Sequence, residues 1–363
     1  MVLTPAAREF VGAITFEAVT GRRAYTEIFG AGNALDHIRL ARDAEIVILA
    51  PATADLLART AHGHADDLLT ACLLAATCPV LAVPAMNDRM WANLQTQRNV
   101  ALLREAGYDI LEPETGPLAV GEGSGPGRMP EPETILAHAG RVLDSDPALA
   151  GRKLVVTAGA TREPIDPVRF ISNHSSGLMG TAVAAAAWRR GAQVTLVAGH
   201  LEVPEPVGPM IVRTTTTADM QTAVAEALRD ADALIMAAAP ADFTPARPAA
   251  GKLSKADSAR SLELIVASDI LATTTASRGR AVVVGFALET GDAERKGAAK
   301  LTAKDLDLIV VNDQTESGAG FGGETNRVTL LARDGHREEL PLMLKSELAD
   351  LLLDRVAGLI SGR

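Results

Sequence analysis

The sequence predicts an α/β protein with two domains, and three observations lead to that prediction. The chain has 363 residues, which is the usual length of about two domains. Short apolar runs, which are candidates for buried strands, alternate with alanine-rich stretches that are candidates for helices. This alternation is typical of parallel sheets covered by helices on both faces. Hydrophobic residues make up 47% of the chain, which is enough for two cores and excludes disorder as the main state.

Seven apolar runs are candidates for buried strands. They lie at residues 44–49, 80–83, 154–157, 193–197, 233–238, 282–286 and 308–311. A boundary is expected near residues 141–152, so that the domains span residues 1–145 and 150–363. Residues 243–260 lose the periodicity and are expected to form a long loop, which is either functional or disordered.

The start of the chain is typical of the end of a strand followed by a helix. Thr4 suits the N-cap of that helix and Pro5 suits its first position. We therefore expect a strand–helix unit to be missing ahead of Met1.

Composition excludes several classes of function. No apolar run approaches the roughly 20 residues of a membrane span, and no signal peptide is recognisable. The net charge of −10 argues against a nucleic-acid-binding surface. Cys72 and Cys78 form no disulfide framework and indicate a reducing, cytoplasmic location.

Two strand ends carry candidate binding groups in the first half. The strand near residue 46 runs into Pro51, Ala52 and Thr53, and such a turn suits a planar cofactor or a phosphate. Asn87 follows the next strand, where its amide hydrogens suit a carboxylate, although a plain turn residue is the alternative. Ligands of parallel sheets bind at this edge, outside the carboxyl ends of the strands.

Histidines and glycines supply the other candidates of the first half. His37 is the best acid or base because histidine titrates near neutral pH, and a solvated histidine is the alternative. His62 and His64 have no evident third metal ligand, so no metal site is expected there. Residues 119–129 are dense in glycine and suit either a flap over a ligand or a flexible connector.

Taken in order, these motifs resemble the flavin-dependent phosphopantothenoylcysteine decarboxylases. The runs are His-Ile-x-Leu-Ala, Ala-Pro-Ala-Thr-Ala-Asp, Ala-Asp-Asp-Leu-Leu, Pro-Ala-Met-Asn-x-x-Met-Trp and Gly-Pro-Gly-Arg-Met. The resemblance implies a flavodoxin-like, three-layer domain that binds FMN, with Pro51, Ala52 and Thr53 at the flavin. It also implies that His37 is the catalytic base and that Asn87 binds the substrate carboxylate.

The chain departs from that family at two places. Val120 stands where the family has the cysteine that protonates the enethiol product, and valine has no proton to donate. The family's phosphate-binding turn lies ahead of the point where this chain begins. These departures leave open an alternative, in which the first domain is a degenerate, non-catalytic assembly domain.

A glycine turn and a serine-rich turn mark the second half. The strand at 154–157 ends in a glycine turn, and Ser172, Asn173, Ser175 and Ser176 then precede an alanine-rich helix. Amides at a helix N-terminus bind phosphate, and four polar residues exceed what a cap needs, although plain capping is the alternative. The spacing is not the dinucleotide Gly-x-Gly-x-x-Gly, which argues against an NAD-dependent oxidoreductase.

Charged residues of the second half point to a polyphosphate. Asp242 follows a strand end and suits Mg²⁺ that bridges phosphates, or a simple Asx turn. The chain has only seven lysines, none before residue 153. Lys252 and Lys255 share one loop, and Lys300 and Lys304 share one face of an expected helix. Genome bias explains why lysine is rare, and a solvated face is the alternative reason for the pair.

Almost all of residues 153–355 resemble the bacterial phosphopantothenate–cysteine ligases. The runs that carry this resemblance include Ser-Asn-His-Ser-Ser-Gly, Gly-Phe-Ala-Leu-Glu-Thr and Asp-Leu-Ile-Val-Val-Asn-Asp. The resemblance implies a Rossmann-like, three-layer domain in which CTP activates the phosphopantothenate carboxylate as an acyl cytidylate that cysteine then attacks. Arg169 and Asn173 would contact the acyl cytidylate, and Lys252 would stabilise charge. The implied CTP site comprises Ala237, Ala238, Asp242, Lys252, Ala267, Ser268, Asp269, Ile270, Phe286, Lys300 and Lys304.

Together, the two resemblances predict a bifunctional enzyme of coenzyme A biosynthesis. They imply FMN, CTP and Mg²⁺, and a homo-oligomer built from decarboxylase trimers and ligase dimers. A regulatory flavoprotein subunit is the non-enzymatic rival, and the intact ligase motifs argue against it for the whole chain.

Overall fold

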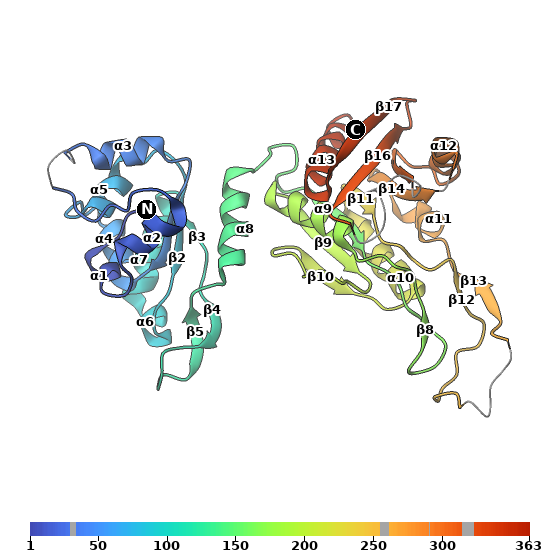
Figure 1. Cartoon of the computed structure of the whole chain (residues 1–363), viewed down its shortest axis with the longest axis horizontal. Coiled ribbons are helices and arrows are strands. Elements are labelled where there is room, and N and C mark those ends of the chain that lie inside the picture. The colour runs from blue at the N-terminus through green and yellow to red at the C-terminus, as the bar shows by residue number, and fades with distance from the viewer. Residues whose placement is uncertain (30–33, 255–260, 290, 314–322) are drawn as a thin grey trace. The chain divides into compact units, whose positions relative to one another are not determined.

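The chain divides into two compact units. The computed structural model describes residues 1–29, 34–254, 261–289, 291–313 and 323–363. Contacts group them into unit 1, Met1–Leu143, and unit 2, Asp144–Arg363 (Figure 1). Each unit contains its own hydrophobic clusters and is described by itself.

Unit 1 is built on three parallel strands in the order β1-β2-β3. The strands are β1 (Val47–Ala52), β2 (Val80–Pro84) and β3 (Asp109–Ile110). Its helices are α1 (Pro5–Arg8), α2 (Ala13–Thr20), α3 (Asp36–Asp43), α4 (Ala54–Ala61), α5 (Leu68–Ala75), α6 (Asp88–Ala92), α7 (Leu94–Glu105) and α8 (Pro132–Leu143). As predicted, Thr4 caps α1, because its Oγ1 accepts a hydrogen bond from Ala7 N at 3.1 Å.

The glycine-dense segment of unit 1 forms an antiparallel hairpin. Its strands are β4 (Glu114–Pro117) and β5 (Ser124–Arg128). The segment therefore folds as part of a hairpin, which is called the flap below.

Unit 2 contains an eight-stranded sheet in the order β10-β9-β6-β11-β14-β15-β16-β17. Its strands are β6 (Lys153–Ala158), β9 (Gln193–Ala198), β10 (Met210–Arg213), β11 (Ala233–Met236), β14 (Val282–Glu289), β15 (Leu308–Asp313), β16 (Thr325–Ala332) and β17 (Arg337–Leu344). The first six strands of that order are parallel, so their carboxyl ends share one edge. Two short antiparallel pairs lie outside the sheet: β7 (Glu163–Pro164) with β8 (Phe170–Ile171), and β12 (Phe243–Pro245) with β13 (Leu264–Val266).

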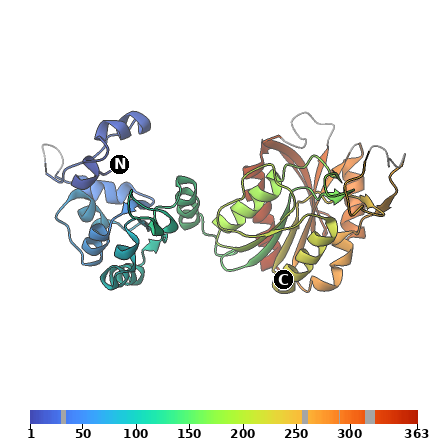
Figure 2. The same cartoon turned by 90° about the horizontal axis from the view of Figure 1, so that it is seen from below.

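Helices cover both faces of this sheet, as Figure 2 shows. They are α9 (Leu178–Arg189), α10 (Thr217–Ala227), α11 (Ile270–Thr273), α12 (Ala293–Ala303) and α13 (Lys345–Ser361), with single 3₁₀ turns at Leu228–Asp230 and Thr275–Ser277. Successive strand residues point to opposite faces, so Val156 packs with α9 and α13, whereas Val155 packs with α10 and α11. This arrangement confirms the predicted three-layer α/β unit.

Two sequence predictions about unit 2 are corrected by the structure. The sheet is not parallel throughout, because β16 and β17 join it antiparallel. Residues 243–260 are not a loop from end to end, since β12 begins at Phe243. Within the described ranges, no helix is long and apolar enough to span a bilayer.

Candidate active sites

In unit 1, the turn after β1 lies beside the turn after β2. Ala85 N donates a hydrogen bond to Ala52 O at 3.2 Å, which joins the two strand ends. Ala52 is fully buried, whereas Pro51 and Thr53 are exposed at this edge. The Thr53 side chain accepts from Leu56 N at 3.2 Å and caps α4. The residues predicted to hold a flavin therefore share one edge with the segment that carries Asn87.

Asn87 itself is the N-cap of α6. Its Oδ1 accepts from Arg89 N at 2.9 Å, which leaves the amide hydrogens as the part of the side chain that suits a carboxylate. The hairpin β4–β5 is anchored next to it, because Met86 N donates to Gly127 O at 3.0 Å. A Cβ at Gly127 would lie 2.1 Å from Met86 O, so only glycine permits this approach. The base of the flap is thus fixed beside Asn87.

Val120 lies at the tip of that flap. Its side chain is fully exposed, in a turn that Glu122 N closes by donating to Ala119 O at 2.9 Å. The position predicted to need an acid is therefore presented to solvent and carries an apolar side chain.

His37 lies apart from these groups. It belongs to α3, which packs on α5, and its Nδ1 is buried with no hydrogen-bond partner among the described residues. Figure 1 shows α3 at one end of unit 1, and α6 with the hairpin β4–β5 at the other. One copy of the chain therefore does not bring His37 to Asn87.

His62 and His64 lie in the turn that follows α4. In the part of the chain that the structure describes, no three histidine, cysteine, aspartate or glutamate side chains form a group that could hold a metal ion.

In unit 2, the ends of β6 and β11 meet at Asn173. Thr157 Oγ1 accepts from Ala238 N at 3.0 Å, and Gly159 O accepts from Ala239 N at 2.9 Å. The Asn173 amide donates to Ala239 O, and its Oδ1 accepts from Ser175 N at 3.0 Å. The structure thus brings Asn173 to the backbone of Ala239, next to Ala238 in the chain.

Arg169 and the loop of Lys252 also meet. Arg169 Nη2 donates to Leu253 O at 2.7 Å, while the neighbouring Lys252 side chain is exposed. Arg169 therefore contacts the backbone of the loop that carries Lys252. Lys255 lies outside the described residues.

A third cluster joins Asp242 to the segment 267–270 and to α12. Ala267 N donates to Asp242 O at 2.9 Å, and the exposed Asp242 carboxylate stands beside the segment that runs through Ser268 to Ile270. Lys304 Nζ lies 3.0 Å from Asp269 Oδ2. Burial acts to raise the pKa of Asp269, but the Lys304 ammonium and the Ala272 N–H hold that pKa below its ordinary value.

Lys300 and Phe286 lie on opposite faces of the sheet. Lys300 Nζ is 2.5 Å from Glu289 Oε1, and Leu301 beside it belongs to the cluster under α10 and α11. Phe286 packs against the cluster under α9 and α13. A single ligand can contact both residues only if it crosses the edge of the sheet at the ends of the strands.

Sequence reasoning missed a network of buried polar side chains behind these groups. Thr161, Glu163, Asp166 and Thr217 are at most 3% exposed. Glu163 Oε1 accepts from both Thr217 N and Thr217 Oγ1, at 2.8 and 2.9 Å, and so binds the start of α10 to β7. The run Thr-Arg-Glu-Pro-Ile-Asp was the available signal, but nothing in it separates buried carboxylates from solvated ones.

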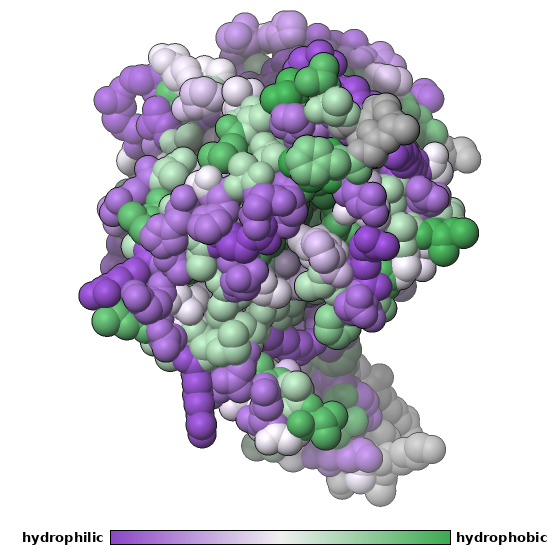
Figure 3. Space-filling view, turned by 90° about the vertical axis from the view of Figure 1, so that its left-hand side faces the viewer, coloured by the Kyte–Doolittle hydropathy of each residue, from purple (hydrophilic) through white to green (hydrophobic). Residues whose placement is uncertain are grey.

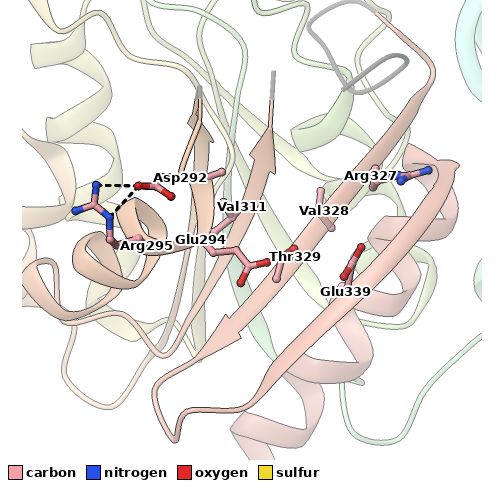
Figure 4. Close-up of a pocket in the computed structure, with 9 residues that line it drawn as sticks. Asp292, Glu294, Arg295, Val311, Arg327, Val328, Thr329 and Glu339 are labelled. Atoms are coloured by element: carbon pink, nitrogen blue, oxygen red, sulfur yellow. Dashed lines mark hydrogen bonds and ion pairs between the residues drawn. The ribbon is translucent and has the colours of Figure 1, made fainter. Parts of the chain in front are cut away.

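Two open clefts lie elsewhere in unit 2. One has a volume of about 570 Å³ and is lined by the start of α12 and by β15, β16 and β17. Figure 4 shows Arg295 paired with Asp292 at its rim, and Val311, Val328 and Thr329 on the strands. The other, of about 410 Å³, lies between Arg162, His200 and Arg213. None of the residues predicted from the sequence lines either of these two clefts.

Two family models match the chain, one for each unit. Residues 1–143 match the family described as Flavoprotein, and residues 149–359 match the DNA/pantothenate metabolism flavoprotein C-terminal domain. A solved structure of the C-terminal domain of a coenzyme A biosynthesis bifunctional protein CoaBC is 34% identical, with a TM-score of 0.52, over 60% of this chain and 100% of that one. The molecule is thus a flavoprotein domain fused to a pantothenate-metabolism domain.

Relatives that match the whole chain define the family. The coenzyme A biosynthesis bifunctional protein CoaBC of Mycobacterium tuberculosis H37Rv is 45% identical, over 100% of this chain and 90% of the relative. The protein of the same name from Bacillus subtilis strain 168 is 42% identical, over 99% of this chain and 89% of the relative. The chain belongs to the family of coenzyme A biosynthesis bifunctional proteins. The predicted family, fold class and bifunctional enzyme of coenzyme A biosynthesis are confirmed.

Proposed function

We propose that residues 150–363 ligate cysteine to 4'-phosphopantothenate with CTP, and that residues 1–145 then decarboxylate the product with FMN. In the first reaction the substrate carboxylate attacks the α-phosphate of CTP and pyrophosphate leaves. The cysteine amine then displaces CMP and forms the amide. The observation that carries the proposal is that the ends of the parallel strands β6 and β11 hold Asn173 beside Ala239, while Arg169 contacts the loop that carries Lys252.

The ligase residues have separate roles in this proposal. Asn173 is held by Ala239 O and Ser175 N, so its side chain keeps one orientation at the acyl cytidylate. Arg169 and Lys252 place positive charge where phosphate and oxyanion charge develops, which is where preorganised cations accelerate a reaction most. The exposed Lys252 side chain is free to reach a ligand above the strand ends.

CTP would bind next to Ala237 and Ala238, between Asp242 and the lysines of α12. Lys300 and Lys304 are already paired with Glu289 and Asp269. Both lysine side chains are partly exposed, and ion pairs near the surface are worth only about 0–1 kcal/mol, so a triphosphate can replace the carboxylates. Asp242 is a single carboxylate, which suits Mg²⁺ that takes its other ligands from phosphates and water. Phe286 and the segment Ala267–Ile270 complete the proposed CTP site.

FMN fits the exposed turn after β1. Pro51 and Thr53 lie open at the strand end, and β1 is an edge strand whose Ile48 is 38% exposed. When bound, FMN supplies the oxidation of the substrate thiol and later returns the electrons. Asn87 would hold the substrate carboxylate, and His37 would act as the base.

The separation of His37 from Asn87 supports a decarboxylase site that lies between subunits. Two copies can supply the two residues that one copy keeps apart, as the expected trimer would. Phe10, Ile14 and Val19 of unit 1 are each at least 76% exposed. Figure 3 shows apolar groups among polar ones on the face of unit 1 turned toward the viewer. In unit 2, Val266 of β13 is 77% exposed, which supports the ligase dimer.

Both cysteines are free, which supports a location in the reducing cytoplasm.

Val120 favours one alternative, an active ligase with a non-catalytic first domain. Purified protein that is colourless and gains no flavin absorbance when mixed with FMN supports that alternative. Bound flavin together with release of CO₂ from phosphopantothenoylcysteine rejects it.

The ligase proposal is tested by pyrophosphate release with CTP, Mg²⁺, 4'-phosphopantothenate and cysteine. We expect Lys252→Gln and Asn173→Ala each to lower the rate by about 10²-fold, a loss of about 2.7 kcal/mol of transition-state stabilisation. Lys153→Gln is the matched control, because Lys153 is exposed at the amino end of β6. Rates near wild type in both site variants, or no pyrophosphate from the wild type, contradict the proposal.

A further inference from the structure

Asp166 is a buried carboxylate in the turn between β7 and β8. Its side chain has no exposed area, although the three residues that follow it are exposed. Its Oδ1 accepts from Val168 N and Arg169 N, each at 2.8 Å. One oxygen therefore fixes the backbone of the turn that carries Arg169.

The other oxygen of Asp166 connects two distant segments. Oδ2 accepts from Arg169 Nε at 2.9 Å and from Arg169 Nη2, so the guanidinium is held through two of its nitrogens. The same Oδ2 accepts from Leu253 N at 3.2 Å, and Arg169 Nη2 donates to Leu253 O at 2.7 Å. Both backbone groups of Leu253 are thus tied to the Asp166–Arg169 pair.

This connection fixes the loop that carries Lys252. Residues 246–254 form no helix or strand of their own, so their position depends on tethers to other elements. A second tether lies close by, where Ala249 N donates to Ile165 O at 2.9 Å. Lys252 lies between these two tethers, one residue from the Asp166 contact.

Charge supports the same conclusion. Burial acts to raise the pKa of Asp166, but the hydrogen bonds from Arg169 and from the Val168, Arg169 and Leu253 N–H groups outweigh it and hold that pKa well below its ordinary value. At neutral pH the Asp166 carboxylate is therefore ionised and remains paired with the Arg169 guanidinium. Half of the Arg169 side chain remains exposed for a ligand.

We propose that Asp166 is a positioning residue of the ligase, which holds the Arg169 guanidinium and the Lys252 loop together so that both cations face the acyl cytidylate. Asp166 touches no reacting atom in this account and acts only through Arg169 and Leu253. The inference rests on the proposed function of residues 150–363.

The first test is Asp166→Asn in the full chain. The amide keeps the size of the side chain but places an N–H group against the donors of Arg169 and Leu253. We expect kcat for ligation to fall by about 10²-fold, the cost of misplacing reacting partners by about 1 Å. The KM for CTP should rise by a smaller factor than kcat falls, because Lys300 and Lys304 of the proposed CTP site are untouched.

Asp146→Asn is the matched control. Asp146 also accepts hydrogen bonds from a backbone N–H, that of Ala148 at 2.8 Å, and from an arginine, Arg190 at 2.6 Å. It lies, however, at the end of unit 2 opposite the carboxyl ends of the parallel strands. This variant should lower the melting temperature without lowering kcat. An equal loss of kcat in both variants shows a general effect of destabilisation and overturns the proposal.

A double-mutant cycle with Arg169→Gln separates positioning from mere stability. If Asp166 acts through Arg169 and the Leu253 loop, the loss of rate in the double variant should be smaller than the product of the two single losses, because part of the Asp166 effect is already absent in Arg169→Gln. Fully additive losses, or a near-wild-type rate for Asp166→Asn, overturn the proposal. A wild-type chain without CTP-dependent ligation refutes the proposed function instead, so the two failures are distinguishable.

A second measurement applies even if Asp166→Asn does not fold. Arg169→Gly removes the guanidinium that pairs with Asp166. Ethylguanidinium added to this variant should raise the ligation rate at least about tenfold, because it can form the same charge-assisted hydrogen bonds with the Asp166 carboxylate. Ethylammonium, which lacks the planar fork, should restore less. No restoration by ethylguanidinium overturns the proposal.

Discussion

Gly180 is the point where α9 touches the sheet most closely, and replacing it by alanine tests how the site is held. A Cβ at Gly180 would lie 2.5 Å from Thr157 O and 2.6 Å from Ala158 Cβ. β6 cannot yield, because it pairs with β9 on one side and β11 on the other. The start of α9 would therefore move outward, together with the segment from Asn173 that leads into it.

The size of the effect follows from two opposing terms. Overpacking against fixed backbone costs up to about 3 kcal/mol, and the better helix propensity of alanine returns about 1 kcal/mol. The net loss of about 2 kcal/mol corresponds to a fall of roughly 4–8 °C in the melting temperature of a unit of this size. Ligation should fall further, by about 10²-fold, because Asn173 is displaced with the helix.

Calorimetry of the full chain and the pyrophosphate assay measure these two effects. Gly358→Ala is the matched control, because Gly358 is exposed in α13 and a Cβ there would meet no atom within 4 Å. It should stabilise unit 2 by about 0.5–1 kcal/mol and leave ligation unchanged. If Gly180→Ala melts at or above the wild-type temperature with full ligase activity, the reasoning about α9 is wrong.

Three further predictions address other parts of the molecule. Val120→Cys should speed formation of the final decarboxylation product without loss of stability, because Val120 is fully exposed at the flap tip; an unchanged product rate contradicts this. Ala148 N–H and Arg190 hold the pKa of Asp146 below its ordinary value, so its contribution to stability is present above about pH 4 and is lost as the pH falls further. Melting curves of Asp146→Asn should lack that loss. Burial raises the pKa of Cys72 to about 11, so iodoacetamide at pH 8 should label Cys78 before Cys72, as peptide mass spectrometry can show.

The strands that sequence patterns could predict are those buried on both faces. β2 and β9 begin at the expected residues, because uninterrupted apolar runs mark strands covered on both sides. The hairpin β16–β17 escaped prediction although Asp334 and Gly335 form a turn signal between the strands. The residues of β17 are mostly exposed or half-exposed at the edge of the sheet, so their hydrophobic pattern is weak.

The site was predictable only in part, for a related reason. Resemblance identified Asn173 and Ala238, and the parallel order of β6 and β11 explains why residues so distant in sequence meet. Asp166 gave no signal, since its burial depends on Leu253, which lies 87 residues further along the chain. Nor did the sequence reveal that α3, which contains His37, and α6, which Asn87 caps, lie at opposite ends of unit 1 (Figure 1).

The central claim is that one chain performs both steps of the proposed sequence. Mass spectrometry of a single reaction that contains the purified chain, FMN, Mg²⁺, CTP, cysteine and 4'-phosphopantothenate tests it most directly. The account predicts that phosphopantothenoylcysteine forms first and is then converted to 4'-phosphopantetheine, with one CMP and one CO₂ released for each product. Accumulation of phosphopantothenoylcysteine with no 4'-phosphopantetheine would contradict the account for the first domain, and absence of both products would contradict it for the whole chain.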